Sequence, residues 1–330
     1  MSLHSGSTGM VVRPRVGIAA PAQAASNNGN WHTAARWAEH LKSVAEVSIF
    51  EQWSGQPLHV LIALHARKSA PSVEAFRRAV PAGRIVLVMT GTDLYRDLPD
   101  DPLARRSIEL ADEIVVLQPR ALHVLPAAAA GKARVIVQSS DAEPRIPAAP
   151  MAGRPVRFIA IGHLRDVKDP LTFARAAARL AGDPRVAFDH IGEALDPKLG
   201  IELQALTKDC PNYRWLGGLP HEATLARLKA ADALVHPSRM EGGANVVIEA
   251  VRSGIPVLAS AIDGNIGLLG EAYEGYFDVG DDAALARLMQ RFTSDSAFPA
   301  RLAAHCGRSS EQFAPHREAD AVRALVAAAP

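Results

Sequence analysis

The sequence predicts an α/β protein made of two doubly wound, Rossmann-like domains. Short apolar runs alternate along the chain with segments of helical periodicity, as in parallel sheets covered by helices on both faces. This alternation is interrupted between residues 141 and 155 by a stretch rich in proline and alanine. At 330 residues, the chain is also longer than one hydrophobic core usually serves. We therefore expect two domains joined by that stretch.

The first half contains a series of short apolar segments suited to strands buried on both faces. They are Val16–Ala20, Val44–Phe50, Val60–Leu64, Ile85–Met89, Glu113–Leu117 and Arg134–Val137. Helical segments separate them, which predicts repeated β-α-β units and an N-terminal domain over residues 13–145.

The second half repeats the alternation and predicts another domain over residues 155–312. Its expected strands are Val156–Ile161, Val186–Ile191, Tyr213–Leu216, Ala233–His236, Pro256–Ala259 and Gly275–Val279. Helices are expected at Leu171–Leu180, Ala223–Ala230 and Ala244–Ser253. Residues 313–330 are rich in alanine and amphipathic, which indicates a terminal helix that covers a domain. Ligands of such sheets bind beyond the carboxyl ends of the strands, so a cleft between the domains is the expected site.

Composition excludes several classes of protein. The 36 basic and 35 acidic residues nearly cancel, which argues against nucleic acid or an anionic membrane as partner. Cys210 and Cys306 lie far apart and lack metal-ligand spacing, as expected of free thiols in a reducing cytoplasm. The Ser/Gly-rich segment Met1–Val12 lacks the order of a signal peptide, and no apolar run reaches the ~18 residues of a membrane span. We expect a soluble cytoplasmic protein; the sequence does not indicate its oligomeric state.

The most informative stretch runs from Pro237 to Ala250 and joins a strand to a helix. Gly242 and Gly243 allow the backbone to approach a phosphate, and the following helix start offers unpaired N–H groups. One helical turn later, Glu249 could accept hydrogen bonds from both hydroxyls of a ribose. The alternative is a surface helix with solvated glutamates and a glycine used for tight packing.

A second loop, Ile161–Pro170, also leaves a strand and enters a helix. Gly162 permits a sharp exit, while Arg165 and Lys168 bring positive charge to the carboxyl edge of the sheet. A solvated loop with a Lys–Asp pair is the alternative. Two loops suited to phosphate at one sheet edge favour a diphosphate site.

These two loops resemble those of the retaining glycosyltransferases of family four, which have the GT-B fold. The match covers the glycine-to-lysine loop, Pro237–Ser238, Glu241, Glu249–Ala250 and Gly254–Val257. The resemblance implies that Lys168 and a nearby arginine hold the diphosphate of a nucleotide sugar, that Glu249 holds the ribose and that Glu241 lies near the sugar. The unpaired N–H groups at the helix start extend the expected donor site to Ala244, Asn245 and Val246. His163 stands where the family often has arginine, so Arg165 or Arg239 is expected to supply the second cation.

The acceptor is expected on the N-terminal domain. Its first turn lacks G-x-G-x-x-G, so a nicotinamide enzyme is not indicated. Asparagine amides gather there around the start of a helix, where one asparagine would serve as a cap. The expected acceptor residues in this turn are Asn28, Gly29, Asn30 and Thr33, with Asn27 beside them.

Two further strand ends carry polar side chains toward the same cleft. His65, Arg67 and Lys68 follow one strand, and Thr90, Thr92 and Asp93 follow the next. His65 alone is more often a loop histidine with satisfied hydrogen bonds. Two cations beside it favour a small anionic acceptor, because a hydroxyl acceptor would not require them. We expect Arg67, Lys68, Thr90 and Thr92 to bind this acceptor, with His65, Asp93 and Glu241 as catalytic candidates.

A narrower resemblance covers nearly the whole chain from Pro14 onward. It is carried by the runs 27–37, 64–67, 90–97, 190–197 and 238–245. In these segments the chain looks like the selenosugar synthases of bacterial selenoneine biosynthesis. That resemblance implies transfer between selenophosphate and a UDP-sugar, either UDP-N-acetylglucosamine or UDP-glucose, to give a selenosugar, UDP and phosphate.

The expected chemistry is displacement at the anomeric carbon without a cofactor or a metal. N–H groups between Gly243 and Val246, together with Lys168, would stabilise the departing diphosphate. The acidic pairs Asp100–Asp101 and Asp281–Asp282 are interpreted as helix caps and surface charge. Because a selenium nucleophile is already anionic, His65 and Asp93 would position it. The resembling family retains the anomeric configuration, whereas direct attack by selenophosphate would invert it, so we expect a β-linked product. A glycosyltransferase with a hydroxyl acceptor and a non-catalytic sugar-binding protein are the alternatives.

Overall fold

The protein forms two α/β domains, each built on a six-stranded parallel sheet. The computed structural model describes residues 13–21, 29–145 and 153–327. The strand order is β2-β1-β3-β4-β5-β6 in the first domain and β12-β11-β10-β7-β8-β9 in the second. In both sheets the order reverses beside the first strand of the domain, which is the doubly wound arrangement that the sequence predicts. The predicted fold class is confirmed.

The first sheet is made of strands whose side chains are mostly buried. They are β1 (Arg15–Ala19), β2 (Glu46–Phe50), β3 (Val60–Leu64), β4 (Arg84–Met89), β5 (Glu113–Val116) and β6 (Ala133–Val135). Its α-helices are α1 (Gly29–Leu41), α2 (Ala70–Ala79), α3 (Pro102–Leu110) and α4 (Ala127–Ala130). Two tighter or wider turns, η2 (Asp93–Asp97) and η3 (Pro119–Val124), follow β4 and β5. Apolar clusters fill both faces of the sheet, as expected for strands covered on each side.

The second sheet contains β7 (Val156–Ile161), β8 (Val186–Ile191), β9 (Tyr213–Trp215), β10 (Ala233–His236), β11 (Val257–Ser260) and β12 (Tyr276–Phe277). The helices in sequence are α5 (Pro170–Ala178), α6 (Pro197–Thr207), α7 (His221–Ala230), α8 (Asn245–Arg252), α9 (Asp263–Leu269), α10 (Asp282–Ser294) and α11 (Ala297–Ser309). The short turns η4 (Asp166–Lys168) and η5 (Ser310–Phe313) precede α5 and follow α11.

Strand ends differ from the predictions mainly at the sheet edges. The expected strand Val44–Phe50 begins at Glu46, because the chain is still turning out of α1 at Val44. The expected strand Gly275–Val279 shrinks to the two residues of β12, which pair with β11 alone. Asp101 and Asp281 cap the starts of α3 and α10 by accepting backbone N–H bonds, as the acidic pairs predict.

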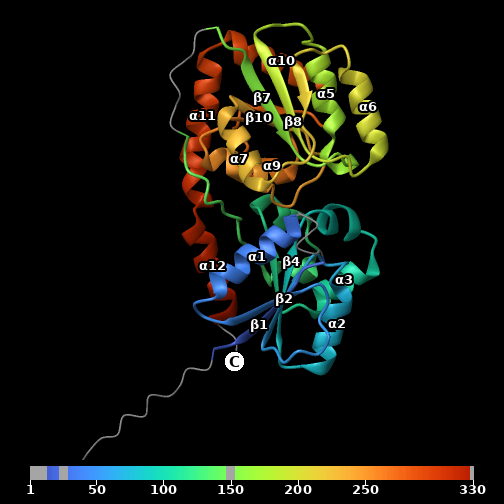
Figure 1. The fold of residues 1–330 in the computed structure, drawn as a ribbon. Coiled ribbons are helices and arrows are strands. Elements are labelled where there is room, and N and C mark those ends of the chain that lie inside the picture. Colours follow the sequence, from blue (N-terminus) through green and yellow to red (C-terminus); the bar gives the residue numbers. More distant parts are fainter. Residues whose placement is uncertain (1–12, 22–28, 146–152, 328–330) are drawn as a thin grey trace, which may run out of the picture.

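The last helix, α12 (Pro315–Ala327), returns to the first domain. Figure 1 shows α11 and α12 running along one side of the molecule, with α12 beside α1. Val322, Leu325 and Val326 of α12 join the apolar cluster that contains Trp37 of α1. The C-terminal helix therefore covers the N-terminal domain, although the helix that precedes it, α11, belongs to the second domain. No helix in the described ranges is long and apolar enough to cross a membrane.

Candidate functional site

The carboxyl ends of the two sheets face each other across a cavity of about 300 Å³. Its lining comes from loops of both domains, which follow β3 and β4 in the first and β7 and β10 in the second. A neighbouring hollow of about 450 Å³ belongs to the second domain and shares Gly162, His163, Asn245 and Val246 with the cavity. The predicted interdomain cleft is therefore present, with two adjoining compartments.

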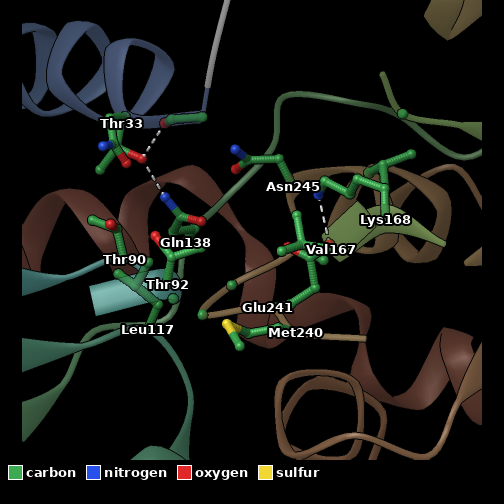
Figure 2. Close-up of a pocket in the computed structure, with 18 of the residues that line it drawn as sticks. Thr33, Thr90, Thr92, Leu117, Gln138, Val167, Lys168, Met240, Glu241 and Asn245 are labelled. Carbon is green, nitrogen blue, oxygen red and sulfur yellow. Dashed lines mark hydrogen bonds and ion pairs between the residues drawn. The ribbon is translucent and has the colours of Figure 1, made fainter. Parts of the chain in front are cut away.

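The loops after β7 and β10 meet at an ion pair between Lys168 and Glu241. Lys168 Nζ donates to Glu241 Oε1 at 2.5 Å, as Figure 2 shows, and His236 Nε2 lies 3.3 Å from the same oxygen. Burial raises the pKa of Glu241, but Lys168 and His236 outweigh it, so the pKa lies well below its usual range. Glu241 is thus held as a carboxylate whose charge is matched by Lys168.

The predicted glycine turn lies against the first domain. A Cβ on Gly242 would lie 2.5 Å from the carbonyl of Thr90, and one on Gly91 would lie 2.7 Å from the backbone nitrogen of Gly242. Gly91 also has a φ of 129°, which favours glycine. The close approach of the two domains thus explains why residue 242 is a glycine, and the sequence alone did not reveal this.

The helix start after this turn faces the cavity. Ala244, the N-cap of α8, makes no side-chain cap bond, and Gly243, Ala244, Asn245 and Val246 all line the cavity. Uncapped N–H groups at a helix start favour a bound anion. Gly162 and Arg165, from the loop after β7, line the same cavity.

Glu249 lies one turn into α8 and lines the neighbouring hollow. His221, at the start of α7, places its Nε2 3.8 Å from Glu249 Oε1. Burial raises the pKa of Glu249, against the opposing effect of His221 and Arg36. Glu241 and Glu249 therefore line the two adjoining compartments.

His65 follows β3 and has a left-handed backbone, with a φ of 72°. Such a conformation costs ~1–3 kcal/mol in a residue other than glycine and tends to occur at functional sites. Its Nε2 lies 3.1 Å from Thr92 Oγ1, and its Nδ1 accepts from the N–H of Lys68 at 3.4 Å. Both ring nitrogens are therefore engaged within the protein. Burial and Lys68 lower the pKa of His65, against the effect of Asp93.

Asp93 does not reach the cleft, contrary to the expectation that it converges there with His65. It is fully buried, and its carboxylate accepts hydrogen bonds from the N–H groups of Ala66, Thr90 and Gly91. A carboxylate occupied by three backbone donors organises the loop rather than facing a substrate.

Two arginines expected to bind ligand are engaged elsewhere and lie outside the lining of the cavity. Arg67 Nε pairs with Asp97 Oδ2 at 2.8 Å, and Arg239 NH2 pairs with Asp169 Oδ2 at 3.2 Å. The charges of both arginines are neutralised by carboxylates that are distant in the sequence and come close only when the chain folds. The structure thus does not bring Arg67 or Arg239 into the site, whereas Lys68 and Arg165 both line the cavity.

The first turn of the N-terminal domain is described only in part. Gly29, Asn30 and Thr33 line the cavity, as do Thr90 and Thr92. Asn27 and Asn28 lie outside the described residues.

The sequence-based prediction missed two residues of the site. Gln138 follows β6, lines the cavity and bonds Thr33 Oγ1 at 2.5 Å, as drawn in Figure 2. His221 lines the neighbouring hollow beside Glu249. Both come after predicted strands, at the carboxyl edge, and that position is the signal that could have found them. Among the described residues, no group of His, Cys, Asp or Glu could hold a metal ion.

Residues 142–312 match the model of a family described as glycosyl transferases group 1. The chain is 31% identical over 175 residues to a D-inositol 3-phosphate glycosyltransferase of Salinispora arenicola, covering 50% of this chain and 39% of that protein. It is also 31% identical over 113 residues to glycosyltransferase 1 domain-containing protein 1 of Xenopus tropicalis, covering 34% of this chain and 33% of that protein. The match thus spans less than half the length of either relative.

Solved structures share the fold across nearly the whole chain. Anabaena Alr3699/HepE, determined in complex with UDP and glucose, superposes with a TM-score of 0.77 at 15% identity and covers 96% of this chain and 100% of that chain. Sucrose-phosphate synthase from Thermosynechococcus elongatus gives a TM-score of 0.75 at 17% identity, with the same coverage. The arrangement of two facing Rossmann-like domains is therefore that of GT-B glycosyltransferases.

Proposed function

Because this chain belongs to the glycosyl transferases group 1 family, we propose that it transfers a hexose from a UDP-sugar to selenophosphate. The products would be a selenosugar, UDP and phosphate. Alr3699/HepE has been crystallised with UDP-glucose, which supports a UDP-sugar as donor. The resemblance of the chain to selenosugar synthases supports the acceptor.

The donor would span both compartments. Glu249 would accept hydrogen bonds from the ribose hydroxyls in the neighbouring hollow, where a carboxylate is suited to two donors. The diphosphate would lie at the start of α8, where Asn245 and Val246 line both compartments. Lys168 would share its charge between the diphosphate and Glu241, so that no metal is required.

One observation carries the choice of an anionic acceptor. Among the described residues that line the cavity, Glu241 is the only carboxylate, and it is paired with Lys168. His65 uses both ring nitrogens within the protein, and Asp93 is buried behind its loop. His163, the other histidine of the lining, accepts from the N–H of Glu193 through Nδ1 at 3.1 Å, so its proton is on Nε2. The titratable side chains that could act as a general base in the described lining are thus engaged within the protein, and an anionic nucleophile, unlike a hydroxyl acceptor, needs no base.

The reaction would proceed by attack of selenium on the anomeric carbon. The new Se–C bond forms as the bond from that carbon to the diphosphate oxygen breaks, and UDP leaves with the electron pair. Water then cleaves the Se–P bond and releases phosphate. Direct attack inverts the anomeric centre, so we expect a β-linked product; an anomeric proton coupling typical of an α product would contradict this step.

The test is UDP release from UDP-N-acetylglucosamine and UDP-glucose, with and without selenophosphate, followed by mass analysis. We expect release only when selenophosphate is present, and its loss in Lys168→Met. Lys198→Met, which removes an exposed lysine of α6 outside both compartments, is the matched control. Release with a hydroxyl acceptor but not with selenophosphate would favour a conventional glycosyltransferase, and binding without turnover a sugar-binding protein. The free, buried Cys210 and Cys306 favour a reducing compartment such as the cytoplasm for this reaction.

A further inference from the structure

Two cations, one from each domain, belong to the lining of the cavity. Lys68 follows β3 in the first domain, and Arg165 follows β7 in the second. Both side chains line the interdomain cavity. Within the described part of the chain, neither has a carboxylate at ion-pair distance, whereas Arg67, Lys168 and Arg239 each have one. Lys68 and Arg165 are thus the cations whose charge the described residues leave unmatched in this cavity.

The like charges of Lys68 and Arg165 repel each other, which is electrostatically unfavourable. Burial lowers the pKa of Lys68, and the charge of Arg165 across the cleft is the next cause, followed by Arg67. Like charges brought together in a partly enclosed cleft repel, and an anion placed between them reverses the sign of the interaction. The domains are nonetheless close here, because Gly91 and Gly242 meet without room for a Cβ. An anion between Lys68 and Arg165 would therefore stabilise this arrangement of the domains.

Thr92 adds a neutral donor on the side of the first domain. Because His65 Nδ1 accepts from the N–H of Lys68, the ring carries its proton on Nε2. That Nε2–H then donates to Thr92 Oγ1, 3.1 Å away. The hydroxyl hydrogen of Thr92 is left to donate into the cavity, which Thr92 lines. His65 is thus a positioning residue for Thr92.

We propose that Lys68, Arg165 and Thr92 form one oxyanion subsite for a phosphate-type, tetrahedral group, and that filling it draws the two domains together. This subsite is separate from the donor diphosphate at Lys168 and the start of α8, so Arg165 serves the acceptor rather than the donor. The role of this subsite in transfer rests on the proposed function, in which the bound group would be the phosphoryl end of selenophosphate. That the subsite binds an anion does not depend on the proposed function.

A ligand that bridges the domains contributes its full binding free energy only in the closed arrangement. The donor diphosphate would lie in the same cavity, which is lined by both domains, so UDP binding also favours that arrangement. The two ligands should therefore bind cooperatively, and by linkage each should raise the affinity of the other by the same factor.

The experiment uses inorganic phosphate as the probe and isothermal titration calorimetry on the full chain, with and without UDP. Lys68→Met and Arg165→Met should each weaken phosphate binding by about tenfold or more, as expected when a charged hydrogen bond is lost. The affinity of both variants for UDP alone should stay within about twofold of wild type, since neither is a donor ligand. UDP should tighten phosphate binding in wild type and lose this effect in Arg165→Met. Lys198→Met and Arg287→Met, which remove exposed cations outside the cavity, are the matched controls.

His65→Gln and Thr92→Val test the tautomer argument. Thr92→Val should weaken phosphate binding, and His65→Gln should retain part of it because the amide can still donate to Thr92. In turnover, Lys68→Met should raise KM for selenophosphate more than KM for the UDP-sugar.

Three results would overturn the subsite: wild-type affinity for phosphate in both Lys68→Met and Arg165→Met, no phosphate binding to wild type, or an equal loss of UDP affinity in Arg165→Met. The last would assign Arg165 to the donor diphosphate. Phosphate binding that depends on Lys68 and Arg165, without any selenosugar formation, would leave the subsite standing and refute the proposed function.

Discussion

Replacing Glu318 with glutamine tests what holds α12 on the first domain. The Glu318 side chain is fully enclosed, and its carboxylate accepts from Trp37 Nε1 at 2.7 Å, Arg36 Nε at 2.8 Å and the N–H of Ser139 at 2.8 Å. These donors come from α1 and from the segment that follows β6. Glutamine keeps the size of the side chain but removes the charge and turns an NH2 toward these donors.

The pKa of Glu318 gives the expected size of the stability loss in Glu318→Gln. Burial raises this pKa, but His40, whose Nε2 lies 3.6 Å from Glu318 Oε2, the charge of Arg36 and the bonds with Ser139 lower it from 4.5 to about 2. At ~1.4 kcal/mol per pKa unit, that difference corresponds to about 3 kcal/mol of folding free energy. Because the folded-state pKa is depressed, this stabilisation is present above pH 4.5 and is lost as the pH falls toward about 2.

The assay is urea unfolding followed by tryptophan fluorescence, to which the buried Trp37 contributes. At pH 7 we expect Glu318→Gln to lower the free energy of unfolding by about 3 kcal/mol, and the gap from wild type to shrink as the pH falls below 4.5. Glu311→Gln, whose side chain is 62% exposed, is the control and should change stability by less than about 0.5 kcal/mol. An unchanged midpoint for Glu318→Gln at pH 7, or a gap that does not depend on pH, would refute the reasoning.

Four further predictions concern the site and the loop that Asp93 organises. Gly242→Ala places a Cβ 2.5 Å from the carbonyl of Thr90, so it should lower kcat; wild-type kcat would show that this contact does not occur during turnover. Glu249→Ala should reduce UDP affinity by a few kcal/mol at most, and unchanged UDP binding in calorimetry would remove Glu249 from the site. Because burial raises the pKa of Glu249, UDP affinity in wild type should begin to fall at a higher pH than for an ordinary carboxylate, and this pH dependence should vanish in the alanine variant. Asp93→Asn should cost about 1–3 kcal/mol of stability, measured by urea unfolding, because one amide oxygen replaces a carboxylate that accepts three N–H bonds; wild-type stability would contradict that role.

Much of the fold could be predicted from local pattern. Val60–Leu64, Val156–Ile161, Val186–Ile191 and Ala233–His236 were predicted with the bounds that the structure has. These strands are flanked on both sides in their sheets, so continuous apolar runs of the right length identify them. Edge strands such as β12 were predicted less well, because pairing on one side alone leaves their ends to local turns.

The sequence by itself determined the proposed donor side of the cleft. There a strand, a loop and a helix start are consecutive, so Lys168, the Gly242–Gly243 turn and Glu249 can be placed from chain order and the geometry of parallel sheets. Tertiary structure alone decided the proposed acceptor side, because a cation can bind a ligand anion only if no neighbouring carboxylate already pairs with it. Arg67 pairs with Asp97 and Arg239 pairs with Asp169, whereas Lys68 and Arg165 line the cavity, and no described carboxylate lies at ion-pair distance from either.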